Sequence, residues 1–293
     1  MDMSIINFGS INIDYVHRVP HFPQPGETLA ATSFEKGLGG KGANQSIAIA
    51  RANGDIKHFG QIGADDGWVL DILKNAGVDT GKVAVTDTPT GHAIIYVDDS
   101  GENNIVLNGG ANQTFTNDAI EAALADATAS DWLLFQNETN NIDHALKVAQ
   151  KNGMKIAYAA APFDAQRAAS IIPHVDLIAV NEIEAQQLAQ ASGKPIDQLE
   201  CDYVLVTKGE KGAELRTPSG TFTSTSFKVD AIDTTGAGDT FLGYFLAEFD
   251  KGTDPERALK IASAASAIQV TRLGAASAIP TYDEVQTFLE TNS

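Results

Sequence analysis

Short apolar runs alternate with longer amphipathic stretches along most of this chain. The apolar runs predict strands at residues 4–8, 56–62, 92–97, 105–107, 132–135, 155–158, 177–180 and 203–207. Between the later runs, apolar residues recur with helical spacing at 118–129, 142–152 and 182–191. Strands and helices that alternate at this spacing are typical of βαβ units. We therefore expect an α/β fold: a doubly wound, mostly parallel sheet flanked by helices.

Three parts of the chain depart from this alternation of strands and helices. The C-terminal part has helical patterns at 240–249, at 255–270 and, as a cover for one edge of the sheet, at 282–289. Residues 12–36 contain several prolines and no helical period. Residues 92–108 predict a β-hairpin with its turn at 98–102. These two segments are expected to form a small antiparallel sheet, which the pattern alone leaves open as a lid or a surface decoration.

Composition and charge restrict the class of protein. A chain of 293 residues with 43% apolar residues forms one large α/β domain or two modest ones. The formal net charge of −18, with no basic cluster, disfavours a nucleic-acid partner. The single cysteine, Cys201, excludes a disulfide framework and a multi-cysteine metal site. The histidines lack metal-ligand spacing and no serine stands in a G-x-S-x-G setting, which argues against zinc and serine-hydrolase chemistry.

The N-terminal segment carries no targeting pattern. The first twenty residues lack the basic and apolar regions of a signal peptide, and no stretch of about 18 apolar residues follows. We therefore expect a cytoplasmic protein with no membrane partner.

The densest glycine cluster lies at residues 37–44, just before a helical run at 45–51. It matches G-x-G-x-x-G, but it does not follow the first strand, and no acidic residue lies about 20 positions further on after a second strand. Lys41 is followed by Gly42 rather than Ser or Thr, so the cluster is not a P-loop. Glycines here favour close approach of the backbone to a small ligand at a helix N-terminus, although packing of a tight turn also explains them.

A second glycine motif, at residues 232–241, opens an apolar helix. Gly236 and Gly238 leave backbone N–H groups accessible at the helix N-terminus, where anions bind. Asp239 stands in the same first turn and is able to accept a proton. An anion hole beside a fixed carboxylate suits transfer of a phosphoryl group to a hydroxyl. The alternative is that Asp239 only caps the helix.

Polar residues at strand ends are further candidates. Asn181 and Glu184 follow the strand at 177–180, at the carboxyl end where doubly wound sheets bind ligands. Glu184 suits a hydrated Mg²⁺, although a helix cap explains the pair equally well. Residues 207–212 follow the next strand and either wrap a nucleotide or form a simple turn. Side chains able to bond the hydroxyls of a polyol are Asn12, Asp14, Asn44 and Glu138.

Several motifs occur together in one order, at residues 9–14, 25–28, 39–44 and 233–241. With them the chain resembles the ribokinases of the PfkB family of sugar and nucleoside kinases, from about residue 4 to 289. The resemblance implies a ribokinase-like fold with a small β-sheet lid, often dimeric through the lids. We therefore predict a single domain over residues 1–293, its lid formed by segments of about 12–36 and 90–108, and a homodimer.

The resemblance also implies a reaction, the ATP-dependent phosphorylation of the 5-hydroxyl of D-ribose. Asp239 would be the general base, and the amides of Gly236, Ala237 and Gly238 the anion hole. The implied sugar contacts are Asn12, Asp14, Gly40, Lys41, Asn44, Glu138 and Asp239. The implied ATP contacts are Asn181, Thr207, Gly209, Gly212 and Gly238. The implied metal sites are Glu184, which holds Mg²⁺ through water, and Asp233, Thr235 and Gly274, which hold an activating monovalent cation, usually K⁺.

The chain departs from the family pattern at two places. Residues 159–162 read Ala-Ala-Ala-Pro where ribokinases commonly have Asn-Pro-Ala-Pro, and Ala278 stands where a serine is often found. The alternative functions are a kinase of another small sugar or nucleoside (fructose, deoxyribose or adenosine) and a catalytically silent sugar-binding protein of the same fold. A dinucleotide oxidoreductase rests only on residues 37–42.

Overall fold

A large sheet forms the centre of the molecule in the computed structural model, which describes residues 4–292. Its strands are β1 (Ile5–Phe8), β4 (Ile56–Gly63), β5 (Asp79–Thr86), β8 (Trp132–Phe135), β9 (Lys155–Ala159), β10 (Leu177–Asn181), β11 (Tyr203–Thr207), β12 (Ala213–Thr217) and β13 (Gly220–Ser224). They lie in the order β13-β12-β11-β10-β9-β8-β1-β4-β5. All neighbours pair in parallel except β12 and β13, which form an antiparallel edge. The predicted doubly wound α/β fold is confirmed.

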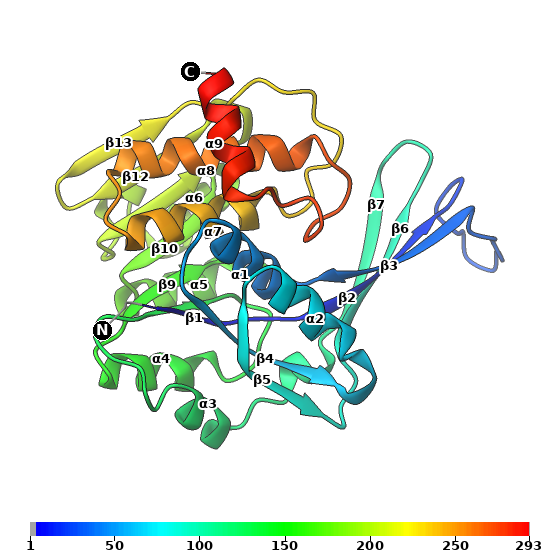
Figure 1. Cartoon of the computed structure of the whole chain (residues 1–293), viewed down its shortest axis with the longest axis horizontal. Coiled ribbons are helices and arrows are strands. Elements are labelled where there is room, and N and C mark those ends of the chain that lie inside the picture. The colour runs from blue at the N-terminus through cyan, green and yellow to red at the C-terminus, as the bar shows by residue number, and fades with distance from the viewer. Residues whose placement is uncertain (1–3, 293) are drawn as a thin grey trace.

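Helices cover both faces of this sheet (Figure 1). They are α1 (Lys41–Arg51), α2 (Trp68–Asn75), α3 (Asn117–Ala123), α4 (Ile142–Lys151), α5 (Ala165–Ile171), α6 (Glu182–Ser192), α7 (Ala237–Asp250), α8 (Pro255–Val270) and α9 (Tyr282–Thr291). Successive strand residues point to opposite faces, so Ile5 packs in the hydrophobic cluster with α1, α7 and α8, whereas Ile6 packs in the one with α3 to α6. Burial on both faces explains why the central strands are almost entirely apolar.

A second sheet projects from the body of the molecule (Figure 1). Its strands are β2 (Asn12–Arg18), β3 (Ser33–Gly39), β6 (Gly91–Val97) and β7 (Asn103–Asn108), in the order β3-β2-β6-β7. We call this sheet the lid. The predicted hairpin is confirmed, since β6 and β7 pair in antiparallel register. The expectation of a fully antiparallel sheet is wrong, because β2 and β6 both run outward from the main body and therefore pair in parallel.

Some elements differ from the sequence-based expectations. The pattern did not predict α2, α5, β5, β12 or β13, and the helix expected at 118–129 ends at Ala123. The chain turns there toward β8, and Asp131 Oδ2 fixes the turn by accepting the Thr128 N–H at 2.8 Å. The single domain over residues 1–293 stays a prediction, and residues 1–3 and 293 lie outside the described residues. Within residues 4–292 no helix has the length and apolar character needed to cross a membrane.

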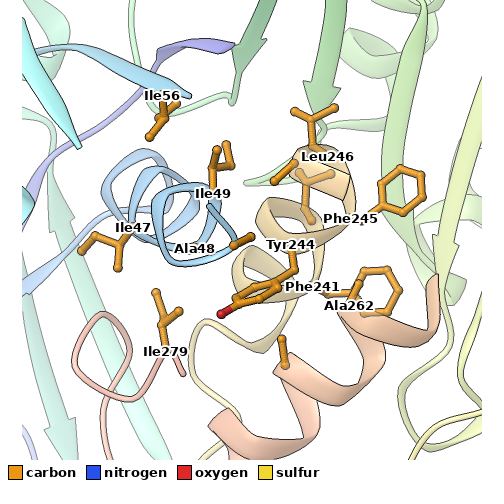
Figure 2. Packing of buried hydrophobic residues seen from close by; sticks show 14 of the residues in the cluster. Ile47, Ala48, Ile49, Ile56, Phe241, Tyr244, Phe245, Leu246, Ala262 and Ile279 are labelled. Carbon is orange, nitrogen blue, oxygen red and sulfur yellow. The ribbon is translucent and has the colours of Figure 1, made fainter. Parts of the chain in front are cut away.

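Close packing of α1 against α7 brings their first turns together. A Cβ on Gly243 of α7 would lie 2.4 Å from the Cβ of Ala48 on α1, so only glycine permits this approach. Figure 2 shows Ala48 facing α7, beside Tyr244, in the hydrophobic cluster that joins the two helices. One turn earlier on each helix stand Asn44 and Asp239, and the helix crossing places these two polar side chains next to each other.

Candidate active site

The predicted sugar contacts converge where the lid meets the N-terminus of α1. Asn12, at the start of β2, is buried, and its Oδ1 accepts a hydrogen bond from Asn112 Nδ2 at 2.8 Å. Gly40 precedes α1 with a φ of 92°, and a Cβ there would lie 2.8 Å from the backbone N of Asn12. Asp14 lies under Gly39, where any Cβ would collide with its carboxylate. Glycine at these positions lets the helix start and the lid strand touch.

Glu138 connects the loop after β8 to this cluster. Its Oε2 accepts the backbone N–H of Lys41 at 3.0 Å and a short hydrogen bond from the Ser10 hydroxyl. Burial raises the pKa of Glu138, while the Ser10 hydroxyl and Lys41 act in the opposite direction. The contact fixes a carboxylate directly in front of the α1 N-terminus, where the helix dipole favours negative charge.

Asp239 lies at the bottom of the cluster, in the first turn of α7. Only 9% of the residue is exposed. Its Oδ2 accepts a hydrogen bond from Asn44 Nδ2 at 3.1 Å and its Oδ1 accepts one from Gln45 Nε2 at 2.9 Å. Burial raises the pKa of Asp239, against the charge of Lys41 and the two amides, which lower it. A carboxylate of raised basicity in a dry pocket is suited to accept a proton.

Three carboxylates therefore share one region, and the charge of Lys41 acts on two of them. Burial, together with the charge of Glu138, raises the pKa of Asp14 to about 6. Asp239 in turn raises the pKa of Glu138, and Lys41 lowers the pKa of both Glu138 and Asp239. The arrangement supplies many hydrogen-bond acceptors around Lys41, which suits a neutral ligand rich in hydroxyl groups.

Sequence reasoning missed several polar residues of this region. Asn112 fixes the link between β1 and β2, because its amide pairs with both the N–H and the carbonyl of Ile11 at 3.0 Å. Gln45 contacts Asp239, and Gln136 contacts Gln45. Gln45 follows Asn44 at the end of the glycine motif, and Gln136 follows the apolar run of β8. The position of each in the sequence could therefore have marked it as a candidate site residue. No such position marks Asn112.

The start of α7 lies beside Asp239. Gly236 is its N-terminal cap, with a φ of 75° that favours glycine, and Gly238 has open space around its Cα. The N–H of Ala237 donates to the Thr234 carbonyl at 3.2 Å, so one of the three predicted anion-hole amides has an internal partner. First-turn N–H groups lack partners within their own helix, which makes such an end a binding place for anions.

Asn181 and Glu184 form a reciprocal cap at the start of α6. Asn181 Oδ1 accepts the N–H groups of Ile183 and Glu184, both at 2.9 Å, and Glu184 Oε2 accepts the N–H of Asn181 at 2.8 Å. The capping alternative is therefore realised. Glu184 Oε1 takes no part in the cap, and burial raises the pKa of Glu184 while the charge of Lys41 lowers it. The Glu184 carboxylate is therefore close enough to Lys41, one of the predicted sugar contacts, for the charge of the lysine to act on it.

The predicted nucleotide contacts continue along the same sheet edge. Thr207 lies opposite Asn181 in the register of β10 and β11. Gly209 and Gly212 both have positive φ, and their turn is closed by bonds from Lys208 N to Gly212 O at 2.8 Å and from Gly212 N to Gly209 O at 3.0 Å. A Cβ on Gly212 would collide with the Ser224 carbonyl. The turn is compact and open to solvent.

The predicted cation segments meet around Asp233. Its Oδ1 accepts the Thr235 N–H at 2.9 Å and its Oδ2 accepts the Gly274 N–H at 3.0 Å. Burial alone would raise the pKa of Asp233, but these hydrogen bonds outweigh it and lower that pKa. The Thr235 carbonyl accepts Gln269 Nε2 at 2.8 Å. Ala278, where a serine was expected, is buried and offers no hydroxyl.

Comparison with known proteins gives the family and the fold of the chain. A family model described as pfkB family carbohydrate kinase matches residues 3–282. A ribokinase of Haemophilus influenzae is 36% identical over 307 residues, covering 99% of both chains. A deoxyribokinase of Salmonella typhi is 30% identical over 311 residues, covering 100% of both. The structure of Arabidopsis thaliana ribokinase complexed with ribose and ATP has a TM-score of 0.86 at 27% identity, covering 99% of both chains.

Proposed function

This chain belongs to the pfkB family of carbohydrate kinases, phosphotransferases that act on a sugar hydroxyl, and we propose that it transfers the γ-phosphoryl group of ATP to the 5-hydroxyl of D-ribose. The products are ribose 5-phosphate and ADP. The ribokinase from Haemophilus influenzae and the Arabidopsis thaliana complex with ribose and ATP support this choice of sugar and nucleotide. Both matches extend over nearly the whole chain.

The observation that carries the proposal is the position of Asp239. It is a buried carboxylate held by two amides, in the first turn of a helix whose N-terminus suits an anion. The predicted sugar contact Asn44 bonds Asp239 directly, and the Gly236–Gly238 amides precede Asp239 at the start of the same helix. A hydroxyl placed against Asp239 therefore faces the place where a phosphoryl group would be held.

The reaction follows from this arrangement. The 5-hydroxyl oxygen attacks the γ-phosphorus, its O–H bond breaks, and the proton passes to the Asp239 carboxylate. The new O–P bond forms as the bond between the γ-phosphorus and the bridging oxygen breaks, and ADP leaves. The amides of Gly236, Ala237 and Gly238 stabilise the charge on the transferred group, and Ala237 must release its bond to Thr234 to take part. Closure of the lid excludes water, so that the sugar rather than solvent receives the phosphoryl group.

The hydroxyl groups of the sugar are held by the polar cluster at the lid. Asn12 and Asp14 reach it from β2, and Lys41 and Asn44 reach it from α1, with the backbone of Gly40 and the carboxylate of Glu138 completing the set. Asn44 Oδ1 is buried and has no hydrogen-bond partner, so a sugar hydroxyl would satisfy it. This unpaired acceptor favours a binding role for Asn44 over a purely structural one.

ATP binds along the exposed edge formed by Asn181, Thr207, Gly209, Gly212 and the start of α7 at Gly238. Glu184 fits a Mg²⁺ ion held through water, because its Oε1 is free of the cap and Mg²⁺ retains several waters beside one or two carboxylates. When bound, Mg²⁺ would neutralise charge on the phosphate oxygens. Glu184 would hold the water shell of the ion by accepting hydrogen bonds with its Oε1.

A monovalent cation, which we take to be K⁺, fits the loop of Asp233, Thr235 and Gly274. The carboxylate of Asp233 keeps a lowered pKa and therefore a full charge, and each carbonyl oxygen has a second lone pair. When bound, the cation would stiffen the loop that leads into α7. Asp233 and the Thr235 carbonyl would be its ligands.

We also propose that two copies associate through their lids. The outer strand β7 exposes Ile105, Val106 and Leu107 by 49–58%, and Phe34 on β3 is 55% exposed. Apolar side chains gathered on one projecting sheet are typical of an interaction surface. Sedimentation of the wild type and of a Val106→Asp variant tests this, and a monomeric wild type at micromolar concentration contradicts it.

The test of the proposed function is Asp239→Asn. Loss of the base should lower kcat about 10²–10⁴-fold, with ribose binding changed by only a few-fold. Coupled ADP release and ribose titration calorimetry measure the two quantities. Turnover near that of the wild type rejects Asp239 as the base, and ribose binding by the wild type without ADP release identifies a silent binding protein.

Deoxyribose is the second candidate substrate, because a deoxyribokinase matches the entire chain at 30% identity. The two sugars differ by the 2-hydroxyl, and a site built to bond that hydroxyl discriminates strongly against a sugar that lacks it. Values of kcat/KM for ribose, deoxyribose, fructose and adenosine decide between them. A higher value for any sugar other than ribose replaces the proposed substrate.

A further inference from the structure

A chain of buried side-chain amides leads from Asp239 back into the central sheet. Gln45 Nε2 donates to Asp239 Oδ1 at 2.9 Å, and Gln136 Nε2 donates to Gln45 Oε1 at 2.7 Å. Gln136 Nε2 also donates to Asn7 Oδ1 at 2.9 Å. Gln45 and Gln136 are at most 2% exposed. Neither residue has a part in the reaction as proposed above.

The series of hydrogen-bonded side-chain amides has a direction, because each amide has a donor end and an acceptor end. Asn7 Nδ2 donates to the Gly42 carbonyl at 2.8 Å and to Ser46 Oγ at 2.9 Å, so Asn7 Oδ1 must face Gln136. Gln136 must then turn its Nε2 toward both Asn7 and Gln45, and its Oε1 is left buried without a partner. Gln45 consequently presents its acceptor to Gln136 and its donor to the carboxylate.

We propose that Gln45 and Gln136 form a positioning clamp for the base, which reserves Oδ1 of Asp239 as an acceptor and leaves Oδ2 as the atom that receives the sugar proton. The proposal rests on the proposed function of Asp239. Gln45 touches the base directly, whereas Gln136 acts only by fixing the direction of the Gln45 amide. We call the two residues the amide clamp.

The two carboxylate oxygens of Asp239 differ in whether the side-chain amide bonded to each of them is free to turn. A proton on Oδ1 would point at the N–H of Gln45, which Gln136 prevents from turning. Oδ2 is bonded by Asn44 Nδ2 at 3.1 Å, and Asn44 Oδ1 is buried without a partner. When the sugar O–H bond breaks and the Oδ2–H bond forms, the Asn44 amide can turn and accept the new O–H group with its Oδ1.

The clamp also sets when the base is ionised. Burial raises the pKa of Asp239, and the charge of Lys41 and the amides of Gln45 and Asn44 lower it. Glu138, on the loop after β8, also couples to Asp239 and is itself coupled to Asp14 on the lid. Removal of the Gln45 donor leaves these charges in place and raises the pKa of Asp239 further, so the base ionises only at higher pH.

The test is the pH profile of kcat for Gln45→Met, a variant of similar volume without a donor. A hydrogen bond to a charged group corresponds to about tenfold to hundredfold in the ionisation equilibrium, so the acidic limb should move up by about 1–2 pH units. At pH values below the limb of the variant, kcat should fall about tenfold or more relative to the wild type and should recover as the pH rises. The KM for ribose should stay within about threefold of the wild type.

Gln136→Met tests the indirect part of the clamp. Gln45 keeps its donor in this variant but is free to turn, so the acidic limb should move in the same direction by a smaller amount. Because Gln136 acts through Gln45, the double variant should match Gln45→Met rather than add a second shift. An additive shift shows that Gln136 acts independently and overturns its assignment.

Ser46→Ala is the matched control. Ser46 is three hydrogen bonds away from Gln45, through Gln136 and Asn7. Its Oγ contacts His58 Nδ1 at 2.7 Å, and the Gly42 carbonyl still holds Asn7 when the hydroxyl is removed. This variant should lower the melting temperature without moving the acidic limb. If Gln45→Met also loses only stability and keeps the wild-type limb, the amides are packing and the clamp is rejected. If Asp239→Asn retains turnover, it is the proposed function that fails.

Discussion

The two halves of the proposed site, the sugar half and the nucleotide half, are built in opposite ways. In the sugar half, Asn12, Asn44 and Asp239 are each at most 9% exposed, and their polar atoms are bonded to residues far away in the sequence. In the nucleotide half, Ile183 is 67% exposed, and the hydrogen bonds around Asn181 and Gly212 are caps and turns within a few residues. One half is held by tertiary structure and the other by local backbone geometry.

The difference indicates how the binding groups in each half are held in position. Groups that must hold a hydroxyl against a base are fixed by a buried network before the sugar arrives, which lowers the cost of organising them during the reaction. A large flexible anion instead meets backbone N–H groups and glycines that it can approach closely. Substitutions in the buried half should therefore change the chemistry and the sugar affinity, whereas those in the exposed half should change the nucleotide and metal requirements.

After Asp239→Asn, the largest effect is expected at the boundary of the two halves, from Gly236→Ala. A Cβ at φ 75° would lie 3.0 Å from Gln269 Nε2 and 3.3 Å from the Cβ of Ala275, so the first amides of α7 must shift. Loss of anion-hole alignment should lower kcat about 10²–10³-fold. The control is Gly252→Ala at the other end of α7, which has φ 78° and open space, and whose turnover should be unchanged. Equal turnover of the two variants would place the phosphoryl group elsewhere.

The next effect tests the buried half through Asp14→Asn. Loss of a charged hydrogen-bond acceptor should raise the KM for ribose about 10–100-fold, measured by steady-state kinetics.

Asp14→Asn should also change how stability depends on pH. The folded-state pKa of Asp14, about 6, lies above the ordinary 3.8, so ionisation of Asp14 removes stability as the pH rises through 4 to 6. The variant should therefore be more stable than the wild type at pH 7–8, by up to about 3 kcal/mol, and this gain should vanish near pH 4. Urea unfolding at both pH values measures it, and a gain independent of pH contradicts the assignment.

A smaller effect is expected in the exposed half, from Glu184→Gln. The amide oxygen preserves the cap at Asn181, while the charge that holds the hydrated Mg²⁺ is lost. The Mg²⁺ concentration for half-maximal activity should rise about tenfold, with kcat at saturation close to the wild type. Glu182→Gln removes an equal charge in the same helical turn and should leave the Mg²⁺ requirement unchanged. A shift as large in the control would assign the effect to overall charge.

The smallest effect is expected at the cation loop. Replacing K⁺ by tetramethylammonium should lower kcat about fivefold, because the loop around Asp233 acts on the anion hole only through α7. Ala278→Ser restores a hydroxyl near the loop and should reduce the K⁺ concentration needed for half-activation. Activity that does not depend on K⁺ in either protein identifies the Asp233 loop as a purely structural turn.

The sequence predicted the central strands and the motif residues because their signals are local. Apolar runs identified β8 and β10. The glycine motifs indicated that helices follow them, but α1 and α7 start at Lys41 and Ala237, inside the motifs, rather than at the expected 45 and 240. The orientation of the lid could not be predicted, since parallel pairing of β2 with β6 depends on where both strands leave the main body. The amide clamp could not be predicted either, because Gln45 meets partners 91 and 194 residues away and its role depends on burial and direction.

The parallel pairing of β2 and β6 has a consequence for the order of folding. β2 is made early, but its neighbour on one side is made only after the whole segment of α1, β4, α2 and β5. Contacts that close long loops form late, so the lid should be among the last parts of the N-terminal half to consolidate. Asn12 acquires its partner Asn112 only at that stage, and Asn44 waits for Asp239 on α7. The newborn chain therefore gains its capacity to hold a sugar only when nearly all of it has been synthesised.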